Sequence, residues 1–165
     1  MQTTICKPFE IYGIGIHSGK PSHVTIKPAP PDNGRAFWVG GSRIQAHFSS
    51  VISCEYCTVL GKGQAQIATV EHLLSAAMGL GIDNLDIVVN GEEIPILDGS
   101  SQQWALGLKQ VGIKRQNKAK DFVVPQKLQS HVVGRQSIDI IPFSHFRISV
   151  EFVSPLNSNQ PTQGQ

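Results

Sequence analysis

The sequence predicts an α+β fold. Residues 1 to about 113 contain both strands and helices, and only strands follow. Apolar and polar residues alternate with period two in several short segments, which is typical of half-buried strands. Two other segments repeat apolar residues three and four positions apart, as amphipathic helices do. The chain has 165 residues, of which 40% are hydrophobic and 16% charged, so it can bury a core.

The first predicted strands surround a turn. Residues 23–28 are predicted to form a half-buried strand, because Val24 and Ile26 alternate with Thr25 and Lys27. The segment PAPPDNG predicts a stiff turn, since proline restricts φ and Asn-Gly tolerates positive φ. The sequence then predicts a returning strand and a further strand, at residues 35–39 and 56–60.

A helix is predicted to begin near Thr69, whose hydroxyl suits an N-cap. Its core-facing stripe repeats at i, i+3, i+4 and i+7 and consists of Val70, Leu73, Leu74 and Ala77. Glu71 and His72 therefore fall in the first helical turn, outside this stripe.

A strand is predicted at residues 84–89, and Asn90-Gly91 after it is a strong hairpin signal. The returning strand at residues 92–97 contains Pro95, which cannot donate a ladder hydrogen bond. This strand is therefore expected at an edge or at a bulge.

A second helix is predicted to follow residue 100. Ser100 and Gln103 have the spacing of a capping box, and Gly112 is a suitable stop. Its core-facing stripe repeats at i, i+4 and i+7 and consists of Trp104, Leu108 and Val111.

The domain organisation follows from where the helices stop. Residues 1–113 are predicted to form the first α+β domain, and the basic run at 114–121 a linker. Residues 122–153 contain strand patterns with no helix to cover them, so they are expected to be part of an incomplete second domain. The polar tail at 154–165 is expected to be disordered.

Composition and charge bear on the class of protein. The formal net charge is only +2, which argues against a nucleic-acid-binding module. The N-terminus has no apolar run behind a basic start, so no secretory signal is expected. No stretch approaches the roughly 20 apolar residues that span a bilayer, so no transmembrane segment is expected. We therefore expect a cytoplasmic protein. Its three cysteines do not form a disulfide framework.

Glu71 and His72 are the candidate catalytic residues. The partial positive charge at a helix N-terminus favours an ionised Glu71 and a neutral His72. A general base needs the first of these states, and a metal ligand needs the second. An ordinary helix start fits the same pattern, because Glu is common in the first turn and His is tolerated there.

Other motifs favour structural roles. GIGIHSGK, residues 13–20, departs from the G-x-G-x-x-G fingerprint at Ser18, so it predicts a tight turn with an exposed His17. Cys54 and Cys57 have the spacing of half a zinc site, but no second Cys-x-x-Cys exists and the segment is predicted to be a strand. The remaining histidines are not at ligand spacing: His23, His47, His131 and His145.

The chain resembles a known enzyme family in four segments. These are GIGIHSGK, IKPAPPDNGRAF, CTVL and the long run TVEHLLSAAMGLGIDNLDIVVNGEEIPILDGSSQQW. Together they resemble UDP-(3-O-acyl)-N-acetylglucosamine deacetylase, the bacterial zinc amidase of lipid A biosynthesis. The resemblance covers nearly the whole chain but only about half of a family member.

The resemblance implies a fold and roles for three residues. Family members have two similar two-layer α/β sandwich domains with a ribosomal-protein-like fold, and the active site lies between them. The resemblance implies Glu71 as the general base and His72 as one Zn²⁺ ligand. It places His17 near the active-site cleft, as a substrate-binding residue. The implied substrate is a UDP-sugar lipid precursor, which is deacetylated.

The chain also departs from the family pattern. The family completes its zinc site with His-x-x-x-Asp in the second domain, but His131 and His145 are followed at that spacing by Arg135 and Ser149. We therefore expect a truncated deacetylase that is inactive alone, in which the missing half or another chain covers the exposed second sheet. The alternative is a shortened, non-catalytic homologue that acts as a binding partner.

Overall fold

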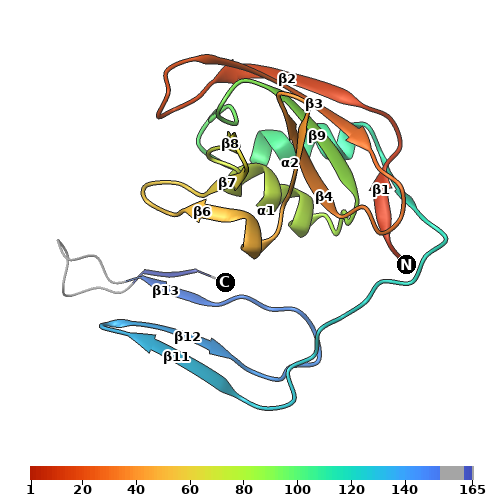
Figure 1. The fold of residues 1–165 in the computed structure, drawn as a ribbon. Coiled ribbons are helices and arrows are strands. Elements are labelled where there is room, and N and C mark those ends of the chain that lie inside the picture. The colour runs from red at the N-terminus through yellow and green to blue at the C-terminus, as the bar shows by residue number, and fades with distance from the viewer. Residues whose placement is uncertain (153–161, 165) are drawn as a thin grey trace. The chain divides into compact units, whose positions relative to one another are not determined.

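The computed structural model describes residues 1–152 and 162–164 (Figure 1). It divides into two compact units, Met1–Lys120 and Asp121–Gln165. The described residues contain two α-helices and several small sheets. The mixture of helix and strand predicted from periodicity is therefore confirmed.

A five-stranded sheet forms the centre of the first unit, and β9 is its middle strand. β9 is antiparallel to β3 on one side and parallel to β4 on the other. The order across the sheet is β2 (Phe9–Ile14), β3 (Pro21–Pro28), β9 (Leu85–Asn90), β4 (Arg35–Val39) and β5 (Ser42–Gln45).

The strand predicted at residues 35–39 exists, but it does not return beside β3 as expected. β9 lies between them, and the connection from Pro28 to Arg35 is longer than the two-residue loop of a tight hairpin. Asp32 and Gly34 in this connection have φ of 64° and 66°, so the turn chemistry of PAPPDNG is present. The side chain of Asn84 accepts a hydrogen bond from the Gly34 N–H at 2.8 Å, which ties the turn to the start of β9.

Two smaller sheets complete the first unit. In one, β7 lies between β6 and β8, and the short 3₁₀ helix η1 (Phe48–Ser50) precedes β6. In the other, β1 pairs with β10. Their strands are β6 (Val51–Ser53), β7 (Val59–Lys62), β8 (Ala65–Ile67), β1 (Thr3–Ile5) and β10 (Ile113–Arg115).

Both helices contribute to one apolar core with the sheets. Of its predicted stripe, α1 (Glu71–Gly79) buries Leu73 and Ala77, whereas Leu74 is half-buried and the buried Val70 is the N-cap just before the helix. α2 (Gln102–Gln110) buries Trp104 and Leu108, and Val111 at its C-cap is half-buried. These side chains pack in one cluster with Ile26 of β3 and with residues of β9. Gly112 has φ of 79° just beyond α2, as the predicted stop requires.

The predicted capping box of α2 is wrong. Ser101 is the N-cap and makes no side-chain capping bond. Ser100 instead continues a small turn, in which it donates to Asp98 Oδ1 and its hydroxyl oxygen accepts from the Gln102 N–H. With Ser101 as the N-cap, the residue three positions later is Trp104, so Gln103 lies one residue too early to complete a capping box.

The hairpin predicted at Asn90-Gly91 is also wrong. After β9 the chain turns away, and the residues that follow lie beside Ala68 instead. The Ala68 N–H donates to the Glu92 carbonyl at 3.1 Å, and the Ile94 N–H donates to the Ala68 carbonyl at 3.0 Å. These backbone groups are therefore not available for a ladder with β9.

The linker predicted at residues 114–121 begins instead as part of the first unit. Lys114 and Arg115 pair with Thr4 and Thr3 in the β1–β10 ladder. Further along, Lys118 forms an ion pair with Asp32 at 2.9 Å. Periodicity did not predict this strand because its residues are exposed on both faces.

A buried amide network holds this region together. Asn84 is 1% exposed, and its Nδ2 donates to Gln2 Oε1 at 2.8 Å and to Gln116 Oε1 at 2.7 Å. Its Oδ1 accepts from Gly34. One side chain therefore connects both ends of the first unit to the turn before β4.

The second unit consists of two strand pairs among the described residues. β11 pairs with β12, and β13 pairs with β14. Three of these strands, β11, β12 and β13, fall within residues 122–153, where strand patterns were expected, whereas residues 122–124 do not form a strand. Much of the tail predicted at 154–165 lies outside the described residues, but residues 162–164 are paired. The strands are β11 (Gln129–Val133), β12 (Gln136–Ile140), β13 (Val150–Phe152) and β14 (Thr162–Gly164).

Candidate active site

Glu71 and His72 are the first two residues of α1, so they lie in its first turn, as the sequence predicted. Both side chains are half-buried. Glu71 Oε2 accepts a hydrogen bond from the Thr58 N–H at 3.2 Å, so the loop between β6 and β7 orients the carboxylate. This role of Thr58 cannot be predicted from its residue type, because the hydrogen bond uses the backbone N–H and not the side chain.

Thr69 does not cap α1 as predicted. The N-cap is Val70, which makes no side-chain capping bond. Thr69 lies before it with φ of 59°, a left-handed conformation that is strained for a β-branched residue. Such strain typically costs about 1–3 kcal/mol and persists only where surrounding contacts enforce it. The Thr69 hydroxyl donates to Glu93 Oε1 at 2.8 Å.

Glu93 is a buried carboxylate, only 3% exposed. Its Oε1 accepts from the His17 N–H at 3.1 Å, and its Oε2 accepts from the Ser18 N–H at 2.8 Å. Burial alone would raise its pKa, but hydrogen bonds from Ser18, His17 and Thr69 outweigh burial and lower the pKa to about 2.

His17 lies in the tight turn after β2, and its side chain is exposed as predicted. The Gly15 N–H donates to the Lys20 carbonyl at 3.0 Å, and the Gly19 N–H donates to the Gly15 carbonyl at 3.0 Å. A Cβ on Gly15 would overlap the Glu93 carboxylate. Glycine is therefore required there for close approach and not for an unusual φ.

Segment 92–96 brings the two motifs together. On one side it lies beside Ala68. On the other side, the Ile96 N–H donates to the Ile14 carbonyl at 3.1 Å. Glu93 was missed from the sequence, because two adjacent glutamates in a predicted strand do not indicate which one is buried.

The described residues do not contain a complete metal site. No group of three or more His, Cys, Asp or Glu side chains in this part of the chain could hold an ion. A catalytic zinc usually has three protein ligands, so His72 fits only one of these positions. Cys54 and Cys57 lie in the loop after β6 and not within a strand as predicted.

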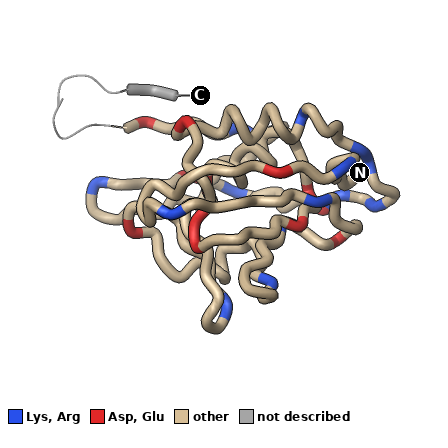
Figure 2. The backbone as a smooth tube through the Cα atoms, turned by 90° about the horizontal axis from the view of Figure 1, so that it is seen from above, with Lys and Arg blue, Asp and Glu red and all other residues tan. Residues whose placement is uncertain are grey.

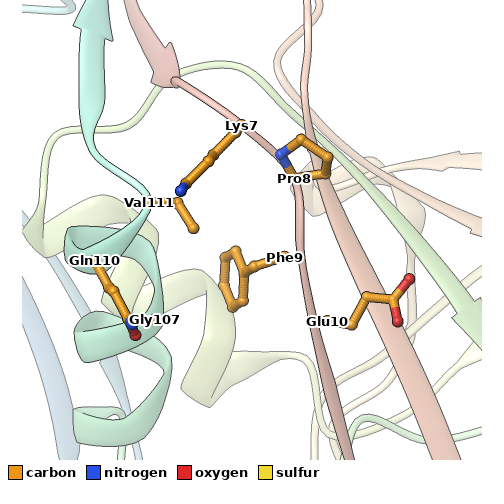
Figure 3. A pocket seen from close by; sticks show the side chains of 7 residues that line it. All are labelled: Lys7, Pro8, Phe9, Glu10, Gly107, Gln110 and Val111. Atoms are coloured by element: carbon orange, nitrogen blue, oxygen red, sulfur yellow. The ribbon is translucent and has the colours of Figure 1, made fainter.

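A separate pocket of about 410 Å³ lies between the start of β2 and the end of α2 (Figure 3). In Figure 3 the Lys7 side chain extends toward Val111, and the Glu10 carboxylate points away from α2. The lining residues are Lys7, Pro8, Phe9, Glu10, Gly107, Gln110 and Val111. None of the residues predicted to act in catalysis lines this pocket.

Charges of both signs are interspersed along the chain (Figure 2). The basic run after α2 is engaged by acidic side chains, because Lys118 and Lys120 pair with Asp32 and Asp83. In the described residues, neither α-helix is long and apolar enough to cross a bilayer.

The depressed pKa of Glu93 predicts a specific acid sensitivity. The carboxylate stabilises the fold above its unfolded pKa, and this contribution is lost as pH falls from about 5 toward 2. A shift from 4.5 to about 2 corresponds to about 3 kcal/mol. Glu93→Gln should therefore lower the free energy of unfolding at pH 7 and flatten its fall below pH 5.

Urea unfolding, followed by tryptophan fluorescence at several pH values, measures the free energy of unfolding of the first unit, because both tryptophans lie in it. The matched control is Glu92→Gln, since Glu92 is exposed and pairs with Lys20 at 3.1 Å. Surface pairs of this kind contribute little. If the free energy of unfolding falls in parallel with pH for wild type and Glu93→Gln, Glu93 does not cause the loss of stability below pH 5.

Comparison with known proteins places the chain in a family. Residues 2–163 match the family described as UDP-3-O-acyl N-acetylglycosamine deacetylase. Proteins named UDP-3-O-acyl-N-acetylglucosamine deacetylase are similar to 96% of this chain. They are 34% identical in Citrifermentans bemidjiense, 35% in Myxococcus xanthus and 39% in Oleidesulfovibrio alaskensis.

These matches cover 54%, 52% and 54% of the three relatives. The chain thus spans about half the length of the curated relatives it matches. The matched residues include the turn at His17, the start of α1 and the segment around Glu93. The chain therefore belongs to the UDP-3-O-acyl-N-acetylglucosamine deacetylase family.

Proposed function

We propose that this chain carries part of the active site of a zinc-dependent deacetylase that acts on a UDP-3-O-acyl-N-acetylglucosamine in lipid A biosynthesis. The observation that supports it best is the start of α1. There the Glu71 carboxylate is held by the Thr58 N–H, and His72 is the next residue.

Glu71 is proposed as the general base. Its carboxylate takes a proton from water as the water oxygen bonds to the acetamide carbonyl carbon. The C–N bond then breaks, the departing nitrogen takes up a proton, and acetate and a free sugar amine are released. His72 is proposed as one ligand of the zinc ion, with the other ligands supplied from outside the described residues. Zinc, when bound, lowers the pKa of water and polarises the carbonyl.

Adjacent positions on a helix suit these two roles. Side chains at i and i+1 point in different directions, so Glu71 and His72 do not compete for the same point in space. The Glu71 carboxylate acts on the water and the His72 imidazole binds the ion, so the two side chains need to reach different points. His17 is proposed to contact the substrate, because its side chain is exposed on the turn tied to the same region.

We also propose the finer architecture that the family implies. The first unit is a two-layer α/β sandwich of the ribosomal-protein type, and the second unit contains the opening strands of a similar domain. Val132 and Ile138 are 66% and 68% exposed, which suits strands that another segment or chain covers. The same exposure favours the second candidate function, a non-catalytic binding partner.

The test measures zinc stoichiometry and acetate release for the 165-residue chain, alone and with the C-terminal half of the Oleidesulfovibrio alaskensis relative. We expect weak zinc binding and no turnover for the chain alone, and tight zinc binding with turnover for the combination. Stoichiometric zinc and turnover in the isolated chain would contradict a divided ligand set. A stable combination that binds no zinc would favour the non-catalytic function.

A further inference from the structure

The Glu93 carboxylate accepts hydrogen bonds from four donor groups. Its two oxygens accept from the His17 N–H, the Ser18 N–H and the Thr69 hydroxyl, and the Ser18 hydroxyl contributes a further hydrogen bond. An ionised carboxylate has about four acceptor sites and no donor, so this set uses its full capacity. The negative charge of Glu93 is therefore stabilised by hydrogen bonds. The ammonium group of Lys20 forms its ion pair with the neighbouring Glu92 and not with Glu93.

The donors come from two segments that are far apart in the sequence. His17 and Ser18 belong to the exposed turn after β2, whereas Thr69 lies two residues before Glu71. Glu93 Oε1 accepts from both the His17 N–H and the Thr69 hydroxyl. Glu93 Oε1 therefore connects the His17 turn to Thr69, the residue that leads into α1.

We propose that Glu93 is a positioning residue, which holds the His17 turn and the first turn of α1 in one fixed arrangement. The inference rests on the proposed function, because it assigns the arrangement to a substrate-contacting His17 and to the catalytic Glu71 and His72. Glu93 itself does not touch the substrate or the ion in this role.

The strain at Thr69 supports a positioning role over a purely stabilising one. Positive φ at a β-branched residue costs free energy, and such strain is found where surrounding structure fixes a functional geometry. The hydrogen bond to Glu93 is the contact that offsets this cost. Gly15 supports the same conclusion, because any larger residue there would displace the carboxylate.

The experiment uses the 165-residue chain and nuclear magnetic resonance. Glu93→Gln keeps the side-chain shape but turns an NH₂ donor toward a cluster of donors, so it should release the turn. We expect amide exchange at His17 and Ser18 to quicken by about tenfold or more relative to β3 amides. We also expect the backbone signals of Glu71 and the ring signals of His72 to shift.

Two controls isolate the carboxylate. Glu92→Gln makes the same chemical change one residue away, at an exposed position, and should leave both readouts unchanged. Thr69→Val removes the hydroxyl at constant shape, and should shift the signals of Glu71 and His72. Thr69→Ser keeps the hydroxyl and should retain the wild-type positions. If Glu93→Gln does not fold, the comparison of Thr69→Val with Thr69→Ser tests the proposal instead.

A purely structural Glu93 predicts a different result. All core amides would exchange faster by the same factor, with no additional effect at His17 and Ser18, and the Glu71 and His72 signals would keep their positions. That outcome, or identical spectra for Thr69→Val and Thr69→Ser, would overturn the proposal. Failure of the deacetylase assay would leave these spectra unaffected, so the inference and the proposed function can fail separately.

Discussion

Replacing Glu71 with glutamine in the assembled deacetylase is expected to lower kcat by about 10²–10⁴-fold, the usual contribution of a general base. The amide keeps the shape of the side chain, and its oxygen can still accept from the Thr58 N–H. It cannot take a proton from water, so only the chemical step is lost. Zinc binding should remain, because the proposed ligand is the neighbouring His72.

Steady-state acetate release and zinc analysis of the same preparation separate these effects. Glu92→Gln serves as the matched control, since it makes the same substitution at an exposed site in the first unit. A Glu71→Gln enzyme with a near-normal rate would exclude the general-base role. Loss of zinc together with activity would instead indicate that Glu71 supports the metal site.

Replacing His72 with alanine should remove tight zinc binding from the assembled enzyme and abolish turnover with it. Loss of a residue that only supports a metal ligand typically costs 10–100-fold in affinity, so loss of a ligand should exceed about 100-fold. His72 is half-buried in the first turn of α1.

Zinc titration with a competing chelator measures the affinity, and circular dichroism checks the fold. His47→Ala is the matched control, because His47 is an exposed histidine of the same unit. Unchanged zinc affinity in His72→Ala would contradict the ligand assignment. Weak zinc binding in both variants would indicate that the change acts on the assembly of the two halves.

The sequence predicted features that depend on local spacing. The apolar stripe of α1 places Leu73 and Ala77 in the core, so the 3.6-residue period was sufficient to place Glu71 and His72 in its first turn. The alternation of residues in β3 likewise predicted that the face of the strand that carries Val24 and Ile26 is buried. Such patterns report which side of an element faces the core.

Features that depend on distant partners were not predicted. Alternation says nothing about which strands are neighbours, so the place of β9 beside β4 could not be foreseen. The burial of Glu93 is possible only because donors from the His17 turn and from Thr69 converge on it. The roles of Asn84 and Thr58 depend in the same way on groups brought together by the fold.

The central position of β9 also determines when the sheet can form during synthesis. β4 is complete at Val39 but β9 only at Asn90, and at about 5–20 residues per second the interval is roughly 3–10 s. Throughout this interval β3 and β4 have edges that lack their final partner, and unpaired edges invite wrong pairing. Any hairpin of β3 with β4 that forms early must open again to admit β9, so the nascent chain cannot complete this sheet in the order in which its strands emerge.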